Sequence, residues 1–143
     1  MKEAYLSFWR GFLDFKGQST RSEYWVPTLV HLALYIVGYL LILFTKDSEV
    51  PFAMLIIIAL VIFGLIAITP TIAVTVRRFH DAGRYGKILI IYYVLSFMSG
   101  ALEDMNNFLS VLLNGLFVIM AIYVFVITVL PSRHVSPDHR SYI

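Results

Sequence analysis

The 143-residue chain is 59% hydrophobic and only 14% charged, with a formal net charge of +2 and a mean hydropathy of +0.81. Soluble domains carry roughly 25% charged residues, so this composition excludes an ordinary soluble enzyme domain and a disordered tail. The sequence contains no cysteine, which excludes disulfides, thiolate metal sites and cysteine nucleophiles. We therefore expect a single domain whose main solvent is lipid.

The N-terminal region, residues 1–25, carries several charges and lacks the apolar run of a secretory signal peptide. Four of its aromatic residues recur at helical spacing: Tyr5, Phe8, Trp9 and Phe12. This spacing predicts a short amphipathic helix over residues 5–15 that lies in the cytoplasmic membrane interface. The alternative is an extension that packs against the other helices.

Four apolar runs follow, and we expect them to span the bilayer at residues 26–44, 51–76, 85–102 and 108–130. A helix needs about 20 residues to cross a hydrocarbon core of about 30 Å. The first, second and fourth runs meet this requirement. The third has 15 uncharged residues, or 18 when it is counted from Tyr85 and Lys87 reaches back to the interface.

Because lipid offers no hydrogen-bond partners, each spanning segment must satisfy its own backbone as a helix. The sequence therefore predicts an all-α polytopic membrane protein with four transmembrane helices and the N-terminal interfacial helix. Pro70, inside the second run, is expected to kink or loosen that helix near Ile66.

The distribution of charge predicts the orientation. Ten of the eleven Lys and Arg residues lie in or directly beside residues 1–25, 77–84 and 131–143. The two remaining connections contain one basic residue and four acids: Lys46, Asp47, Glu49, Glu103 and Asp104. By the positive-inside rule, both termini are expected in the cytoplasm.

Two stretches on the predicted cytoplasmic face, residues 15–25 and 77–87, combine cations, carboxylates and a histidine. The candidate site residues are Arg21, Glu23, Arg77, Arg78, His80, Asp81 and Arg84. One interpretation is a structural network, in which Arg21 and Glu23 pair with each other or with Arg78 and Asp81. Charge pairs at the edge of a low-dielectric region are stronger than in water, and such a network would hold the first span against the connection after the second.

A second interpretation of the same residues is a pocket for an anionic headgroup. Arginine binds phosphate through two parallel hydrogen bonds, and Gly83 and Gly86 allow close approach of the backbone. A third interpretation uses His80 as a general base. Because adjacent residues do not face each other on a helix, its orienting carboxylate would be Glu23 rather than Asp81. The sequence shows no nucleophile motif and no metal-ligand spacing, so we expect no catalytic residue, no metal and no cofactor.

Within residues 26–44, 51–76, 88–102 and 108–130 there is no Asp, Glu, Lys or Arg. This argues against ion-coupled transport by a single copy, since such transporters need ionisable residues along the pathway. Asn114 and Gly115 in the fourth run are predicted to contribute to helix packing, because small and amide side chains are typical of contacts between helices in membranes. The small surface predicted to face them consists of Ser96, Ser99, Gly100 and Ala101 in the third run. An alternative use of this surface is contact between copies of the chain.

Two motifs carry a resemblance to a family. The first is Phe-x-Gly-x-x-x-Arg-x-Glu-Tyr-Trp at residues 15–25, and the second is the Pro-containing run that ends in Arg-Arg-Phe-His-Asp-Ala-Gly-Arg at residues 77–84. They resemble those of the small bacterial inner-membrane proteins known as domain of unknown function 805, and the match covers about residues 8–90. Gln18 stands where that family usually has arginine, and the family's closing Asn-x-Tyr-Gly is absent. The resemblance implies a helical inner-membrane protein and brings no activity with it.

Together these observations predict a non-enzymatic, multi-pass protein of the bacterial inner membrane that binds lipid or a partner through its cytoplasmic cluster. Anionic lipid headgroups are the expected ligands, and a second copy or another membrane protein is a further expected partner. The alternative is a subunit of an oligomeric transporter or channel. Nucleic-acid binding is not expected, because the basic residues stay close to the membrane.

Overall fold

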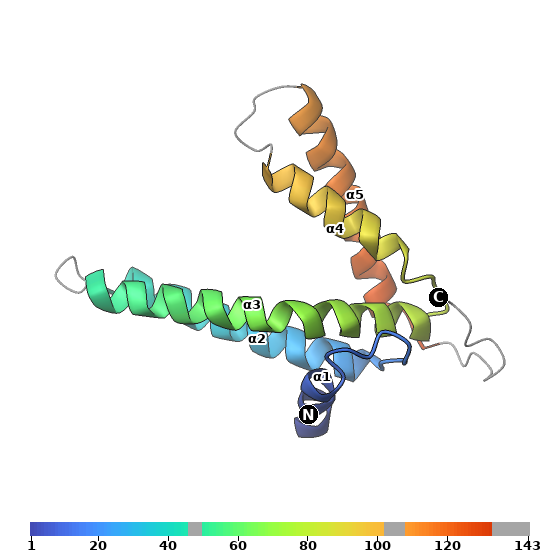
Figure 1. Ribbon diagram of the computed structural model, residues 1–143, viewed down its shortest axis with the longest axis horizontal. Coiled ribbons are helices and arrows are strands. Elements are labelled where there is room, and N and C mark those ends of the chain that lie inside the picture. The colour runs from blue at the N-terminus through green and yellow to red at the C-terminus, as the bar shows by residue number, and fades with distance from the viewer. Residues whose placement is uncertain (46–49, 102–107, 133–143) are drawn as a thin grey trace. The chain divides into compact units, whose positions relative to one another are not determined.

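A computed structural model describes residues 1–45, 50–101 and 108–132 (Figure 1). These residues form five helices: α1 (Lys2–Arg10), α2 (Arg21–Leu43), α3 (Val50–Asp81), α4 (Ile88–Ala101) and α5 (Phe108–Val129). The all-α prediction is confirmed for this part of the chain. Three helices, α2, α3 and α5, are long and apolar enough to cross a membrane, whereas α4 is shorter. The acidic connections predicted outside the membrane and the C-terminal basic residues lie largely outside the described residues.

The chain divides into two compact units. The first contains Met1–Asp14 and Ser22–Val74, and the second contains Phe15–Arg21 and Thr75–Ile143. The first unit therefore holds α1, nearly all of α2 and most of α3. The second holds the last turns of α3, together with α4 and α5.

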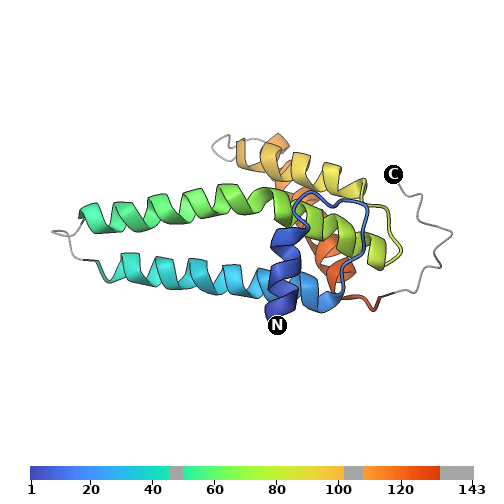
Figure 2. The same cartoon turned by 60° about the horizontal axis from the view of Figure 1, so that its bottom comes forward.

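In the first unit, α1 lies against α2 and α3 (Figure 2). Its aromatic side chains make the contacts. Phe8 is only 2% exposed, and its ring centroid lies 5.0 Å from that of His31 on α2. The ring of Trp9 lies 6.3 Å from that of Phe63 on α3. This is the packing that the sequence offered as the alternative, and the helix ends at Arg10 instead of continuing to residue 15. A position in the membrane interface remains a prediction.

The helices α2 and α3 run antiparallel and side by side within the first unit (Figures 1 and 2). They approach closely at Gly38, which is buried, because a Cβ atom there would lie 2.6 Å from Leu60 Cδ1. The helix α3 continues through Pro70 without interruption. The hydroxyl of Thr71 donates a hydrogen bond of 2.6 Å to the Ala67 carbonyl, so the turn that lacks the proline N–H gains a side-chain hydrogen bond.

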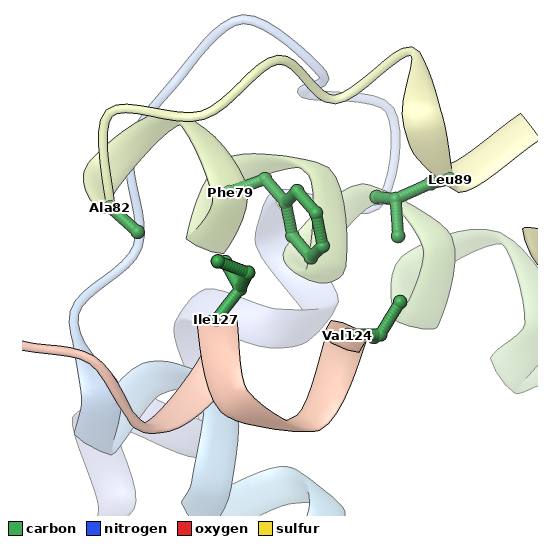
Figure 3. Packing of buried hydrophobic residues seen from close by; sticks show 5 residues of the cluster. All are labelled: Phe79, Ala82, Leu89, Val124 and Ile127. Carbon is green, nitrogen blue, oxygen red and sulfur yellow. The ribbon is translucent and has the colours of Figure 1, made fainter. Parts of the chain in front are cut away.

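The second unit has its own hydrophobic core, to which the end of α3, the start of α4 and the end of α5 contribute. The buried residues of this core are Phe79, Ala82, Leu89, Val124 and Ile127 (Figure 3). Towards the other end of the same helix pair, Ser99 of α4 donates a hydrogen bond to Asn114 Oδ1 of α5. The predicted packing role is therefore confirmed for Ser99 and Asn114. Ser96 and Ala101 are exposed within this unit, and a Cβ atom at Gly100 or Gly115 would meet nothing within 4 Å, so the predicted small surface is not formed there.

The boundary between α3 and α4 differs from the predicted one. The helix α3 reaches Asp81, five residues beyond the expected end of the span, and a glycine turn then closes it. Gly83 has a φ of 68°, and the Arg84 amide donates to the Phe79 carbonyl at 2.9 Å, which is the pattern of a Schellman cap. The helix α4 begins at Ile88, so residues 85–87 belong to the turn and not to the third helix.

Candidate functional site

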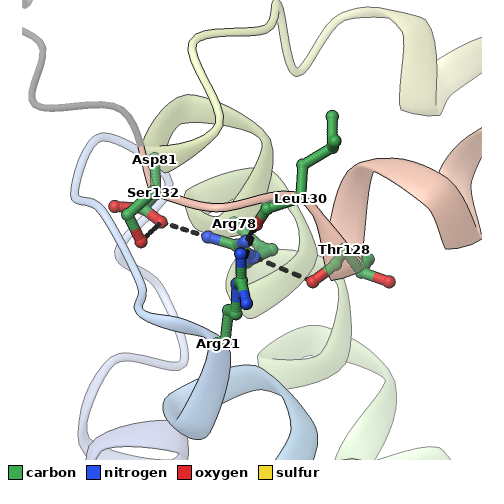
Figure 4. A network of polar contacts seen from close by, with 6 residues as sticks. All are labelled: Arg21, Arg78, Asp81, Thr128, Leu130 and Ser132. Carbon is green, nitrogen blue, oxygen red and sulfur yellow. Dashed lines mark hydrogen bonds and ion pairs between the residues drawn. The ribbon is translucent and has the colours of Figure 1, made fainter.

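The site of interest lies in the second unit and is centred on Arg78, in the last turn of α3 (Figure 4). Its side chain is completely buried. Nε donates to the Thr128 carbonyl at 3.1 Å, and Nη2 donates to the Leu130 carbonyl. Nη1 donates to Asp81 Oδ2. All three guanidinium nitrogens are thus engaged by the protein itself.

The carbonyls that Arg78 binds are those left over where α5 ends. An α-helix leaves its last carbonyls without intrahelical partners. The helix α5 ends at Val129, and Pro131 has no N–H with which to donate to those carbonyls. A guanidinium supplies donors in a planar fork, and its positive charge suits the negative end of the helix dipole. Arg78 therefore caps α5 from a different helix.

Asp81 balances the buried charge. It stands three residues after Arg78 on α3, a spacing that places both side chains on the same face of a helix. Its Oδ2 also accepts a hydrogen bond of 2.6 Å from the hydroxyl of Ser132. Burial of an isolated charge is costly, whereas an ion pair with additional hydrogen bonds is tolerated. Arg78, Asp81 and the end of α5 thus form one polar cluster at the edge of the apolar core.

Arg21 joins this cluster from the start of α2. Its side chain is exposed, and its Nε donates a hydrogen bond of 3.0 Å to the same Leu130 carbonyl that Arg78 binds. The segment before it is fixed on α3, because the Ser19 amide donates to the Arg77 carbonyl at 3.3 Å. The structure therefore brings together Arg21, Arg78 and Asp81 of the predicted set. We call these three residues, with Thr128, Leu130 and Ser132, the Arg78 network.

The remaining candidate residues occupy different environments. Arg77 is buried at 6% exposure, and its carbonyl accepts the bond from Ser19. His80 is half-buried and packs beside Gly86, where a Cβ atom would lie 3.2 Å from His80 Nε2. Arg84 is exposed on the turn after α3. Glu23 lies in the first turn of α2 and belongs to the first unit.

Sequence reasoning missed three members of the network: Thr128, Leu130 and Ser132. Two of them contribute backbone carbonyls, which every residue type possesses, so no side-chain signal pointed to them. One usable signal was Pro131 directly after an apolar run, because such a proline marks the end of a helix and hence a set of carbonyls that need donors.

The cations at this end of the second unit fall into two groups. Arg77 and Arg78 are buried, whereas Lys16, Arg21, Arg84 and Lys87 are exposed. Within the described ranges, no cluster of three or more His, Asp or Glu side chains is arranged to hold a metal ion. The arrangement is suited to two tasks, which are internal bracing by Arg78 and contact with anions by the exposed residues.

Comparison with known proteins gives the family. The family described as "Protein of unknown function (DUF805)" matches residues 12–136, which is most of the chain. The chain belongs to this family. A DUF805 relative, the "Inner membrane protein YhaI" of Escherichia coli strain K12, is 29% identical over 92 residues, covering 63% of this chain and 70% of YhaI. YhaI of Escherichia coli O157:H7 matches with the same values. No solved structure matches this DUF805 chain.

These findings confirm the resemblance that the two sequence motifs carried. Together with the three long apolar helices, they identify this DUF805 chain as a multi-pass protein of the bacterial inner membrane. The family description names no activity, so the functional interpretation has to come from the residues of the site.

Proposed function

We propose that this DUF805 protein is a non-enzymatic membrane component that binds anionic lipid headgroups with exposed cations of its second unit. In this proposal the Arg78 network is the structural support, and Arg84, Lys87 and Lys16 make the lipid contacts. The observation that carries the proposal is the separation of the cations, because Arg78 is fully buried while Arg84 and Lys87 are exposed on the turn that follows its helix.

The hydrogen bonds of Arg78 support a structural role for that residue. Each of its three nitrogens donates to a protein acceptor, so a headgroup would have to compete with Asp81 and with the end of α5. Breaking a buried, hydrogen-bonded charge pair costs several kcal/mol, which exceeds the gain from one phosphate contact at the membrane surface. Headgroup contact therefore falls to the exposed cations.

The position of the turn between α3 and α4 supports the proposed contact of Arg84 and Lys87 with lipid headgroups. It joins α3 to α4 over only a few residues, so in a spanning topology it has to lie at a membrane surface. Tyr85, which is 66% exposed, stands between Arg84 and Lys87. An aromatic side chain flanked by cations is typical of the headgroup region. Each cation near an anionic leaflet contributes about 1 kcal/mol of attraction.

The proposal includes four spanning helices with both termini in the cytoplasm. The positive-inside pattern of the sequence favours this topology, since ten of the eleven Lys and Arg residues then lie on the cytoplasmic side. The turn between α3 and α4 faces the cytoplasm in this arrangement, towards the leaflet surface that carries the negative potential.

The test measures lipid preference with the protein reconstituted in nanodiscs that contain phosphatidylglycerol and phosphatidylcholine. We expect phosphatidylglycerol to be enriched around the protein and the double variant Arg84→Gln/Lys87→Gln to lose that enrichment. Two contacts of about 1 kcal/mol each correspond to a relative affinity that is about 30-fold lower.

The matched control is the charge-conserving exchange Arg84→Lys/Lys87→Arg, which should keep the preference. Circular dichroism shows whether each variant retains its helices. An unchanged preference for phosphatidylglycerol in a folded Gln variant would contradict the proposal.

A further inference from the structure

The helix α4 is short for a membrane span. It contains 14 residues, which correspond to about 21 Å at 1.5 Å per residue. The uncharged sequence run between Lys87 and Glu103 is 15 residues long, or about 22 Å when fully helical. A typical hydrocarbon core is about 30 Å thick. The apolar length of α4 therefore falls about 8 Å short of that thickness.

The packing of α4 on α5 shows at which ends α4 is shorter than its neighbour. Leu89 and Val124 share the core at one end of the pair, and Ser99 is bonded to Asn114 towards the other. Ten residues separate the two contacts on α4 and ten separate them on α5, so the antiparallel helices keep a constant register. In this register α4 runs alongside residues 112–125 of α5.

The longer helix α5 therefore extends past α4 at both ends. Residues 108–111 continue beyond the end of α4, and residues 126–129 continue beyond its start. Each extension is one turn, or about 6 Å. Because α5 is long enough to cross a bilayer of ordinary thickness and α4 is not, the shortfall belongs to α4 alone.

The exposed surface of α4 is largely apolar. Its exposed side chains are apolar along most of the helix, at 65% exposure for Ile90, 56% for Ile91, 50% for Val94 and 78% for Phe97. Lys87, which is exposed, stands directly before this apolar strip, and in the sequence Glu103 and Asp104 follow it. In the sequence, charged residues therefore bound this apolar strip on both sides.

We propose that, because of α4, this protein prefers bilayers whose hydrocarbon core is several ångströms thinner than usual. In a thicker bilayer, α4 thins the core locally. The lipids that fit α4 are those with short acyl chains. This inference rests on the four-span topology of the proposed function, and it is independent of the headgroup preference. A lysine side chain reaches outward to the interface, whereas carboxylates are short and costly to bury. The thinning is therefore expected mainly in the leaflet next to Glu103 and Asp104.

The experiment reconstitutes the full chain in phosphatidylcholine bilayers whose monounsaturated acyl chains increase in length from 14 to 22 carbons. The midpoint of thermal unfolding is measured in each bilayer. We expect the wild-type midpoint to be highest in a bilayer with a core thinner than about 30 Å and to fall as the chains lengthen. An optimum at or above that thickness, or a flat profile, would overturn the inference.

Two insertions of equal length test whether α4 is the cause. Four leucines between Ala101 and Leu102 extend the uncharged run beyond the contacts with α5, and should shift the optimum by about 6 Å towards thicker bilayers. Four serines at the same place add the same length of chain without apolar length, and should leave the wild-type optimum unchanged. Equal optima for the leucine and serine insertions would also overturn the inference.

A labelling arm separates failure of this inference from failure of the topology. The chain has no cysteine, so Met105→Cys provides a single label site in the connection after α4. Labelling by an impermeant maleimide from the periplasmic side supports the crossing of α4. Protection of the cysteine from periplasmic maleimide means that α4 does not cross. The four-span topology on which both proposals depend is then wrong. Periplasmic labelling with a flat thickness profile overturns the thinning inference alone.

Discussion

Replacement of Arg78 by methionine tests the Arg78 network directly, because methionine has a similar length and no charge. The substitution removes the donors to Asp81, Thr128 and Leu130. Loss of one partner from a buried ion pair costs about 3–5 kcal/mol. Two of the three acceptors keep another donor, since Ser132 still binds Asp81 and Arg21 still binds Leu130. We therefore expect a loss near the lower end, about 3 kcal/mol.

The assay is the free energy of unfolding from titration with sodium dodecyl sulfate in mixed micelles, followed by circular dichroism. The matched control is Arg84→Met, which removes an exposed arginine six residues further along the chain. Surface substitutions of this kind change stability by about 0.5 kcal/mol or less. Equal losses for Arg78→Met and Arg84→Met would refute the reasoning.

A double-mutant cycle adds a stricter criterion. Asp81→Leu alone leaves the Arg78 guanidinium buried without its counter-charge, whereas the double variant Arg78→Met/Asp81→Leu removes both charges. The losses in unfolding free energy of the two single variants should therefore not add up to the loss of the double variant. The coupling energy should be about 1–3 kcal/mol. Additive losses would mean that the pair contributes nothing as a pair.

Three further predictions use the same unfolding assay. Gly83→Ala places a side chain at a φ of 68° and should lower the unfolding free energy by about 1 kcal/mol. Gly83→Asn should lower it less, because asparagine tolerates this conformation better, and equal losses would contradict the Schellman cap of α3. Ser99→Ala removes the donor to Asn114 and should cost about 0.6 kcal/mol, whereas Ser96→Ala, at an exposed position of the same helix, should cost almost nothing. Phe8→Ala should cost about 3 kcal/mol and speed amide hydrogen exchange in α1, and unchanged exchange would argue against its docking.

Hydrophobic runs were sufficient to predict the helices, but not where they end. The first span was expected from residue 26, yet α2 begins at Arg21 with Glu23 in its first turn. An acidic side chain near a helix N-terminus is favourable, so charge there does not mark the boundary. Likewise α3 continues past Arg77 to Asp81, because the glycine cap at Gly83 ends it and not the first cation.

The candidate site shows a different limit of prediction. Arg21, Arg78 and Asp81 were selected from the sequence because charges beside apolar runs are conspicuous. The two arginines donate to carbonyls near the end of α5, which lie about fifty residues from Arg78 and 109 from Arg21 in the chain. A backbone carbonyl is present in every residue, so the sequence does not show which ones need a donor. The pairing of helix ends is a property of tertiary structure, so it became visible only in three dimensions.

The cap that Arg78 provides for α5 has a consequence for biosynthesis. Arg78 and the Leu130 carbonyl are separated by 52 positions along the chain. At a translation rate of roughly 5–20 residues per second, the ribosome adds those positions over roughly 3–10 s. Throughout that interval the guanidinium has Asp81 beside it, but its two carbonyl acceptors at the end of α5 do not yet exist. Until the last helix is made, water or lipid phosphate has to satisfy the remaining guanidinium donors. A chain that stops before Leu130 lacks this cap.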